Sequence, residues 1–353
     1  MRRTWRQRIT FTDVVIWGIG LAIAAVVVVG TIATLRSGKY TPEAWFDLAL
    51  SGLALGGVYA LIALGYTLVY GILRMINFAH SEVFMSGPFT AVFVAQALNR
   101  AGTIDSHPVL SLLLITLVSA SVSCLIAVLL ERIAYRPLRT APRLVPLITA
   151  IGASFFLQYA FRGLYGSGIR AYPTLDILDG AWNIGTFRVF RTDVVIIVSA
   201  MVMMLVLYAI VQRTKIGKAM RAVSEDKEVA SLMGIDVDRV IVVTFALGGF
   251  SAGVAGVLYA LAFPVVNFYM GFIPGLKAFT AAVLGGIGNV PGAFLGAMIL
   301  GVVESIGPNL FLDGLGVPAP NQLKDLVAFV ILVFILIIRP TGILGERLAQ
   351  AKA

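Results

Sequence analysis

The sequence predicts an all-α protein, a polytopic transmembrane helix bundle of about ten spans, one of which is either a full crossing or a half-span. Three observations support this class. Of 353 residues 59% are hydrophobic, the mean hydropathy is +0.94, and only 13% are charged, against about 25% in soluble domains. Many apolar runs approach the roughly 20 residues that a membrane span needs. Lys and Arg collect at the ends of these runs, as they do beside cytoplasmic membrane surfaces.

The apolar runs divide the chain into ten expected spans: 14–35, 47–73, 83–98, 109–130, 144–161, 193–211, 240–262, 276–288, 291–308 and 322–338. Residues 1–40 are interpreted as a leader plus the first span, because the apolar run of about 22 residues exceeds a signal-peptide core. We assign this leader no function. The longest connections hold about 30 residues each, so residues 1–353 are expected to form one transmembrane domain.

The positive charges predict the orientation. With the N-terminus in the cytoplasm, the inside connections hold 18 Lys and Arg and the outside connections hold 7. This excess predicts that both ends of the chain are inside. The expected location is a bacterial plasma (inner) membrane.

The eighth span, 276–288, is unusually short. Its 13 residues form about 20 Å of helix, too little for a hydrocarbon core of roughly 30 Å. It either crosses or dips partway and turns at "GNVPG" (Gly288–Gly292). Irregular backbone at that depth is tolerated where it lines protein or a water-filled cavity, so Gly285, Gly286 and Gly288 are candidate pathway positions.

Small residues recur at four-residue spacing in several spans: Gly52 with Gly56, Gly249 with Gly253, Ala252 with Gly256, and Gly292 with Gly296. Such pairs let helix backbones approach closely in lipid. They predict a tightly packed bundle, as in many transporters and channels, without identifying which.

Polar side chains within or between the apolar runs are costly in a membrane and often functional: Asn77, His80, Glu82, Gln158, Lys277 and Glu304. The group Asn77–Glu82 forms either an ordinary cytoplasmic turn or part of a gate at the inner mouth of a pathway. Glu304 is either paired or directed to the interface, or has a pathway role. Lys277 is either an interfacial anchor or part of the same pathway.

Several function classes are excluded. Neither Gly38-Lys39 nor Gly217-Lys218 has the flanking residues of a Walker A motif. Two histidines and a single cysteine do not make a metal or nucleophilic site. The net charge of +9 is explained by membrane orientation and does not indicate nucleic acid. We expect a non-catalytic membrane subunit without a cofactor of its own.

The connection 212–239 holds 11 charged residues and is interpreted as a cytoplasmic coupling loop. Ser224 is expected to cap a short helix over 225–233, with Glu225 and Asp226 in its first turn. Val229, Leu232 and Met233 give that helix one apolar face, and Gly234 ends it. A solvated connector or an interfacial helix remain alternatives to a helix that docks on a cytoplasmic partner.

Three stretches carry a family resemblance. "EVASLMG" (Glu228–Gly234) resembles the EAA-x3-G loop of ABC importer permeases, with Val229 in place of the first alanine. The segments 52–89 and 275–305 are similar to permease subunits of branched-chain amino-acid ABC importers, of the hydrophobic amino-acid uptake type. The resemblance covers about residues 45–340.

The resemblance implies a mechanism. A second homologous permease subunit shares the pathway, an extracytoplasmic solute-binding protein delivers Leu, Ile or Val, and two ATP-binding subunits hold ATP and Mg inside. Coupling to those subunits is expected at Arg221, Glu225, Asp226, Glu228 and Gly234. The substrate carboxylate is expected near free helix-terminus N–H groups of the broken segment 276–292.

Three alternatives stay open at this point. The first is an ABC permease for urea, short amides or another small solute. The second is a secondary transporter or channel that works alone, for which Glu304 and Lys277 offer little material. The third is a purely structural membrane subunit.

Overall fold

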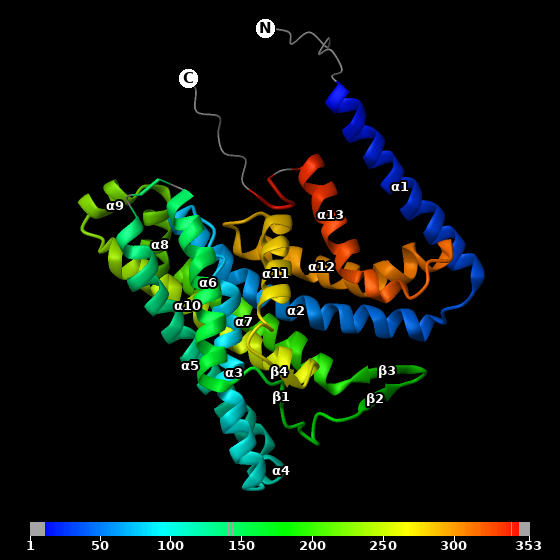
Figure 1. The fold of residues 1–353 in the computed structure, drawn as a ribbon, viewed down its shortest axis with the longest axis horizontal. Helices are drawn as coiled ribbons and strands as arrows, with labels where there is room; N and C mark the ends of the chain where they lie inside the picture. The colour runs from blue at the N-terminus through cyan, green and yellow to red at the C-terminus, as the bar shows by residue number, and fades with distance from the viewer. Residues whose placement is uncertain (1–10, 140, 143, 340, 346–353) are drawn as a thin grey trace.

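A computed structural model describes residues 11–139, 141–142, 144–339 and 341–345 (Figure 1). Residues 1–10 of the expected leader lie outside the described residues. The α-helices are α1 (Phe11–Ser37), α2 (Pro42–Leu73), α3 (His80–Arg100), α4 (Thr103–Ser106), α5 (Pro108–Leu130), α6 (Leu144–Tyr165), α7 (Arg191–Arg213), α8 (Lys215–Glu225), α9 (Lys227–Leu232), α10 (Val237–Ala262), α11 (Phe272–Gly285), α12 (Val290–Phe311) and α13 (Lys324–Ile338). A π-helical turn, η1 (Glu131–Tyr135), continues α5, and three short 3₁₀ turns follow: η2 (Arg136–Leu138), η3 (Asp313–Leu315) and η4 (Pro320–Leu323).

Seven helices of the described chain are long and apolar enough to cross a membrane. A helix also lies at each of the ten expected spans, but α11 is short, with 14 residues. The chain is mostly helical, as the all-α prediction states, and four short strands also form. β2 (Ala181–Ile184) and β3 (Phe187–Phe190) make an antiparallel hairpin, and β1 (Arg170–Ala171) pairs with β4 (Val265–Val266).

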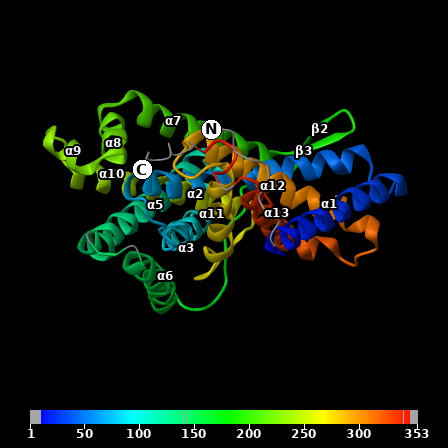
Figure 2. The same cartoon turned by 90° about the horizontal axis from the view of Figure 1, so that it is seen from above.

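Helix α2 lies at the centre of the bundle. Thr41 caps its N-terminus by accepting a hydrogen bond from the Ala44 amide. It packs against α12, α10, α11 and α7, and most of its side chains after residue 55 are buried. Seen from above, α2 and α11 lie between α6 on one side and α7 on the other (Figure 2).

The small-residue pairs do allow close helix crossings, as the sequence predicts. A Cβ on Gly253 of α10 would lie 2.6 Å from the Ser119 carbonyl oxygen and the Ala120 Cα of α5. A Cβ on Gly301 of α12 would lie 2.4 Å from the Gly52 carbonyl oxygen and from the Gly56 backbone of α2. These backbones touch because no side chain separates them.

The bundle has two distinct ends. Helices α8 and α9 lie at one end and the β2–β3 hairpin at the other (Figure 1). We call them the α9 end and the hairpin end. Helix α2 begins near the hairpin end and finishes near the α9 end, and α7 runs in the same direction (Figure 1).

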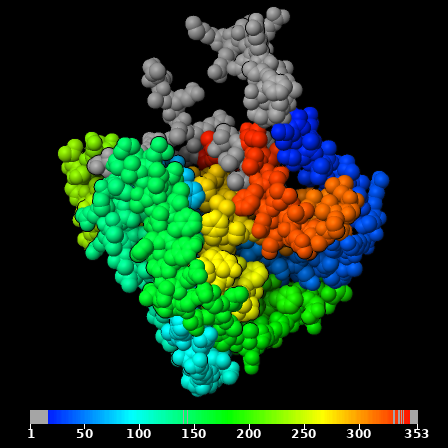
Figure 3. Space-filling view, viewed as in Figure 1, coloured from blue at the N-terminus to red at the C-terminus, as the bar shows by residue number. Residues whose placement is uncertain are grey.

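Helices α11 and α12 form a tight helical hairpin. Gly286 (φ +106°) and Gly288 (φ +98°) make the turn in a backbone region that favours glycine. Asn289 then caps α12 by accepting a hydrogen bond from the Gly292 amide. In the space-filling view the yellow surface of α11 and the segment before it appears between α6 and α12–α13 (Figure 3).

The predicted helix over 225–233 has the wrong boundaries. Helix α8 extends through Ser224 to Glu225, and the Ser224 hydroxyl donates back to the Arg221 carbonyl. Asp226, not Ser224, caps the next helix, α9. Both residues are good N-caps by type, and local sequence does not distinguish them.

Candidate functional site

Helix α8 is held firmly against the end of α7. Thr214 caps it by accepting from the Gly217 amide at 3.1 Å. A Cβ on Gly217 would lie 2.2 Å from the Val211 carbonyl oxygen, so only glycine fits there. The Arg221 guanidinium donates to that same Val211 carbonyl and, at 3.2 Å, to the side-chain oxygen of Gln212. Arg221 therefore holds the α7–α8 corner together.

Helix α9 is short and defined at both ends. The Asp226 carboxylate accepts from the amides of Glu228 (2.8 Å) and Val229 (3.0 Å). At the other end Gly234 takes φ +81°. The Gly234 amide donates to the Ser231 carbonyl, and the next amide, of Ile235, donates to Ala230, which is a Schellman ending.

The apolar residues of α9 face outward. Val229 is 54% exposed, Leu232 86% and Met233 78%, whereas Ala230 is buried against the protein. Glu225 and Glu228 are also exposed. Acidic and large apolar side chains therefore share one free surface, which we call the α9 surface (Val229, Leu232 and Met233 with Glu225 and Glu228).

Two arginines lie near Lys227, in the first turn of α9. Partial burial, together with the nearby Arg139 and Arg74 guanidinium groups, lowers the pKa of Lys227 below its ordinary value. Arg139 also pairs with Glu131 and Asp238, which joins the turn after α5 to the start of α10. These ion pairs fix the frame on which α8 and α9 rest.

A buried polar cluster centres on Glu82, which is fully buried. Its Oε1 accepts hydrogen bonds from Gln158 Nε2 (2.7 Å), Ser154 Oγ (3.2 Å) and Ser81 Oγ (3.3 Å). Its Oε2 has no hydrogen-bond partner among the described residues. Gln158 and Ser154 come from α6, so Glu82 joins α6 to α3.

Asn77 and His80 lie close to this cluster in sequence and are also buried, with 3% and 2% exposure. The Tyr135 hydroxyl donates to Asn77 Oδ1 at 2.6 Å. The His80 ring packs edge-on against Tyr66, with centroids 4.9 Å apart. These side chains therefore lie inside the bundle, at the turn between α2 and α3 and in the first turn of α3.

A second buried cluster contains charged groups. Lys277 Nζ lies 2.6 Å from Glu304 Oε1 and 2.5 Å from Asp325 Oδ1. The Tyr59 hydroxyl donates to Glu304 at 3.3 Å. Lys277 is only 3% exposed and Glu304 only 2%. Lys277 is thus a buried ion-pair partner rather than an interfacial anchor. Glu304 is paired with a neighbouring donor, which was one of the two interpretations of this residue.

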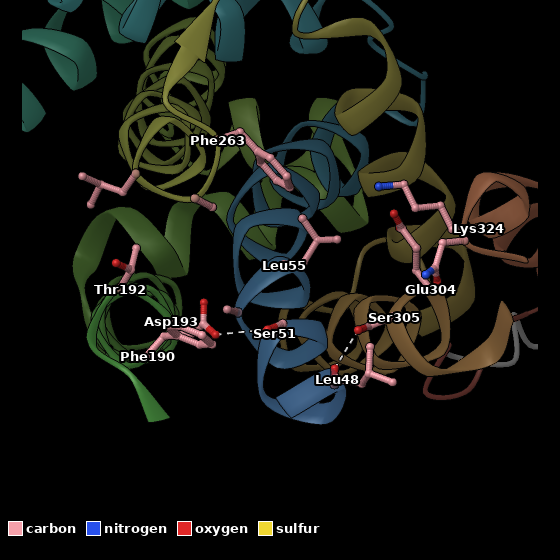
Figure 4. A pocket seen from close by; sticks show the side chains of 14 residues that line it. Leu48, Ser51, Leu55, Phe190, Thr192, Asp193, Phe263, Glu304, Ser305 and Lys324 are labelled. Atoms are coloured by element: carbon pink, nitrogen blue, oxygen red, sulfur yellow. Dashed lines mark hydrogen bonds between the residues drawn. The ribbon is translucent and has the colours of Figure 1, made fainter. Parts of the chain in front are cut away.

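A cavity of about 550 Å³ opens beside the second cluster, at the hairpin end. Its walls come from α2, from the start of α7, from the end of α10, and from α12 and the η4–α13 junction. Figure 4 shows Asp193 and Thr192 on one side, Glu304, Ser305 and Lys324 on the other, and Leu55 between them. Ser51 donates to Asp193 at 3.2 Å, and Ser305 donates to the Leu48 carbonyl at 2.6 Å.

The break between α11 and α12 is closed by other parts of the chain. The amides of Ile343 and Leu344 donate to the carbonyls of Leu284 and Gly285. Asn289 bridges the same parts, since its Nδ2 donates to the Leu344 carbonyl at 3.0 Å while its Oδ1 caps Gly292. The amide of Gly292 is therefore not free for a substrate carboxylate.

The structure brings some predicted residues together and separates others. Lys277 and Glu304 meet directly, and Gln158 meets Glu82. The α9 surface and the two buried clusters are distinct places. Sequence reasoning missed Tyr59, Ser154, Asp325 and Asn289. Asp325, at the start of a predicted span, carried a detectable signal because its charge is opposite to that of Lys277.

Residues 48–336 match a protein family described as the branched-chain amino acid transport system / permease component. The chain belongs to this family. No solved structure was found to match it.

Two relatives are similar to the chain over most of their length, and a third over less than half. The chain is 43% identical over 300 residues to the high-affinity branched-chain amino acid transport system permease protein BraD of Pseudomonas aeruginosa, covering 84% of this chain and 94% of the relative. It is 43% identical over 307 residues to the corresponding protein LivH of Escherichia coli, with the same coverage. The xylose transport system permease protein XylH of Escherichia coli is 27% identical over 179 residues, 45% of each chain.

These relationships and the seven long apolar helices make the chain a multi-pass inner-membrane protein of this permease family. The family match does not by itself assign the α9 surface, the buried clusters or the cavity.

Proposed function

We propose that the chain is the permease subunit of an ATP-driven ABC importer that moves Leu, Ile and Val into the cytoplasm. The observation that carries this proposal is identity above 40% over 84% of the chain to two high-affinity branched-chain amino acid permease proteins. The likeness to the fructose and xylose permease proteins is 30% and 27%, over 45% of the chain. A sugar is therefore the less favoured substrate.

The α9 surface is the proposed contact with the ATP-binding subunits. ATP and Mg belong to those partners, so their motion must enter the bundle through a protein contact. Exposed Leu232 and Met233 supply apolar anchors, and exposed Glu225 and Glu228 supply charge. Interfaces of this kind depend on a few buried anchors with a polar rim.

Arg221 and Asp226 support this contact indirectly. Arg221 ties α8 to the end of α7, so a push on α9 is passed to a membrane-spanning helix. Asp226 holds the first turn of α9, and Gly234 permits its sharp end. In this proposal the five predicted coupling residues divide into contact residues and positioning residues.

The buried clusters are proposed parts of the pathway or of its gates. Glu82 joins α3 to α6, Asn77 joins the turn before α3 to η1 after α5, and His80 packs against Tyr66 of α2. Lys277 and Glu304 join α11 to α12, and Gly285, Gly286 and Gly288 shape the turn between those helices. Buried polar groups have few alternative partners, so they hold discrete helix arrangements of the kind a gate requires.

The complete importer in this proposal contains a second homologous permease subunit, two ATP-binding subunits and an extracytoplasmic solute-binding protein. Alternating access then occurs between the two permease subunits. The proposed orientation is N-in and C-in, with the α9 end in the cytoplasm and the hairpin end facing the binding protein.

Uptake by the reconstituted complete importer tests this function. Labelled leucine uptake should require ATP and be reduced by unlabelled isoleucine and valine, but not by urea or xylose.

Glu228→Arg reverses a charge on the α9 surface, and Gly234→Pro forbids φ +81°. Both should lower uptake at least about tenfold while the protein still inserts in the membrane. Wild-type uptake by both variants would remove the coupling role, and urea-dominated uptake would change the substrate.

A further inference from the structure

The cavity at the hairpin end combines apolar walls with charges of both signs. Leu48 and Leu55 of α2 and Phe263 after α10 form apolar surface, while the ionisable groups are Glu304, Lys324 and, on the opposite wall, Asp193, which accepts a hydrogen bond from Ser51. Its volume of about 550 Å³ lies within the range of roughly 300–1,000 Å³ for small-molecule sites. The cavity is thus large enough and chemically mixed enough for a small amphipathic solute.

Glu304 offers this cavity an unused acceptor. Its Oε1 accepts from Lys277 and from Tyr59, but its Oε2 has no partner among the residues that the structure describes. The side chain is 2% exposed and lines the cavity. A buried carboxylate oxygen without a donor is unfavourable, and a cationic donor that enters the cavity removes that cost.

Lys324 offers the complementary charge. It lies at the start of α13, exposed at the rim of the cavity, and forms no ion pair within the described part of the chain. Figure 4 shows Lys324 and Glu304 on the same side of the cavity. A solute that carries an ammonium and a carboxylate on one carbon atom can therefore present its two charges to Glu304 and Lys324 from the same side of the cavity.

We propose that this cavity binds the zwitterionic form of an apolar α-amino acid during transport. The ammonium lies against Glu304 Oε2, the carboxylate against the Lys324 ammonium, and the side chain against Leu48, Leu55 and Phe263. Neutral solutes such as urea and sugars have no charges for these two groups. The inference rests on the proposed function and names the groups in this chain that recognise the substrate.

The first test is leucine uptake by the complete importer in proteoliposomes. Lys324→Met should lower the maximal rate about tenfold, the magnitude expected for one lost charge-assisted hydrogen bond. Lys324→Arg keeps the charge and should retain most of the rate. Lys39→Met is the matched control, because Lys39 pairs with Asp313 at 2.7 Å and does not line the cavity; its rate should stay within about twofold of wild type.

The second test follows occupancy directly. Leu55→Cys, in a Cys124→Ser background, places a thiol in the cavity of the assembled importer, and Ser37→Cys places one on an exposed position outside it. A small cationic thiol reagent is applied with either the ligand-free or the leucine-loaded binding protein. Leucine should slow modification of Leu55→Cys at least about threefold and leave Ser37→Cys unchanged.

The outcomes separate this inference from the proposed function. Leucine uptake by the wild type with an unaffected Lys324→Met rate would overturn the cavity assignment and leave the importer function intact. Equal modification of Leu55→Cys with and without leucine would do the same. A wild-type importer that does not transport leucine would overturn the proposed function itself.

Discussion

Lys277 shows how a single buried residue depends on its neighbours. It lies 2.6 Å from Glu304 and 2.5 Å from Asp325, in helices that follow it in sequence. Breaking a buried ion pair from one side leaves an uncompensated charge, whereas replacing both partners with apolar groups is often tolerated. Lys277 can therefore be essential when Glu304 is present and dispensable when Glu304 is replaced by an apolar residue.

Lys277→Met should accordingly destabilise the purified protein by about 3–5 kcal/mol, because Glu304 then stays buried without its cation. Thermal unfolding in detergent measures the effect. The double variant with Glu304→Leu should recover much of the loss, and Lys39→Met, at an exposed pair, should have little effect. Equal unfolding midpoints for the wild type and Lys277→Met would contradict a structural role for this pair.

Gly253 gives a second prediction at this scale. A methyl group there would lie 2.6 Å from α5 backbone atoms, so Gly253→Ala must push two helices apart and should cost about 1–3 kcal/mol. Gly152, in α6, has no atom within 4 Å of an added Cβ. Gly152→Ala should therefore be neutral or slightly stabilising. A similar unfolding temperature for both variants would show that the α5–α10 crossing adapts easily.

Among the elements, α9 is a short helix whose first turn depends on a single capping side chain. It has six residues, too few to be stable as an isolated helix, and its first amides are satisfied by Asp226. Since its apolar residues face outward, packing by Ala230 and the two caps are what keep it helical. Its order is thus set locally.

Asp226→Ala should loosen α9 by about 1 kcal/mol, and Asp226→Ser should restore most of its order. Amide hydrogen exchange over residues 227–234 in detergent reports this, with the buried part of α10 as an internal reference. Unchanged exchange in Asp226→Ala would mean that the body of the protein, not the cap, orders α9.

The elements also show which features a sequence can predict. Apolar length located the helices, and four-residue spacing of small residues predicted a tightly packed bundle without saying which helices cross, because both signals are local. The boundary between α8 and α9 was misplaced because Ser224 and Asp226 are equally plausible caps. The contact of Glu82 with Gln158 and the cavity could not be predicted, since both require the relative placement of helices distant in sequence.

The whole molecule is asymmetric along its length. Exposed charged and apolar groups of α9 lie at one end, and the β2–β3 hairpin and the cavity lie at the other (Figure 1). A permease driven from one side and loaded from the other needs such a division. The orientation of the chain in the membrane therefore decides whether the cavity faces the outside solution or the cytoplasm.

The proposed orientation predicts thiol accessibility in spheroplasts. In a Cys124→Ser background, Thr186→Cys in the hairpin turn should react with a membrane-impermeant maleimide in intact spheroplasts. Ser231→Cys in α9 should react only after permeabilisation. Both positions are exposed in the structure, so burial does not confuse the comparison. The reverse pattern would invert the proposed orientation.

The Lys277 cluster also constrains how the protein is made. During synthesis Lys277 leaves the ribosome 27 residues before its partner Glu304, on a helix of only 14 residues. A short helix that carries an unpaired cation is unfavourable in lipid, so we do not expect the translocon to release it into the bilayer alone. We therefore expect α11 and α12 to enter the bilayer together as a hairpin in which Glu304 neutralises Lys277, with α13 later bringing Asp325 as a second anionic partner.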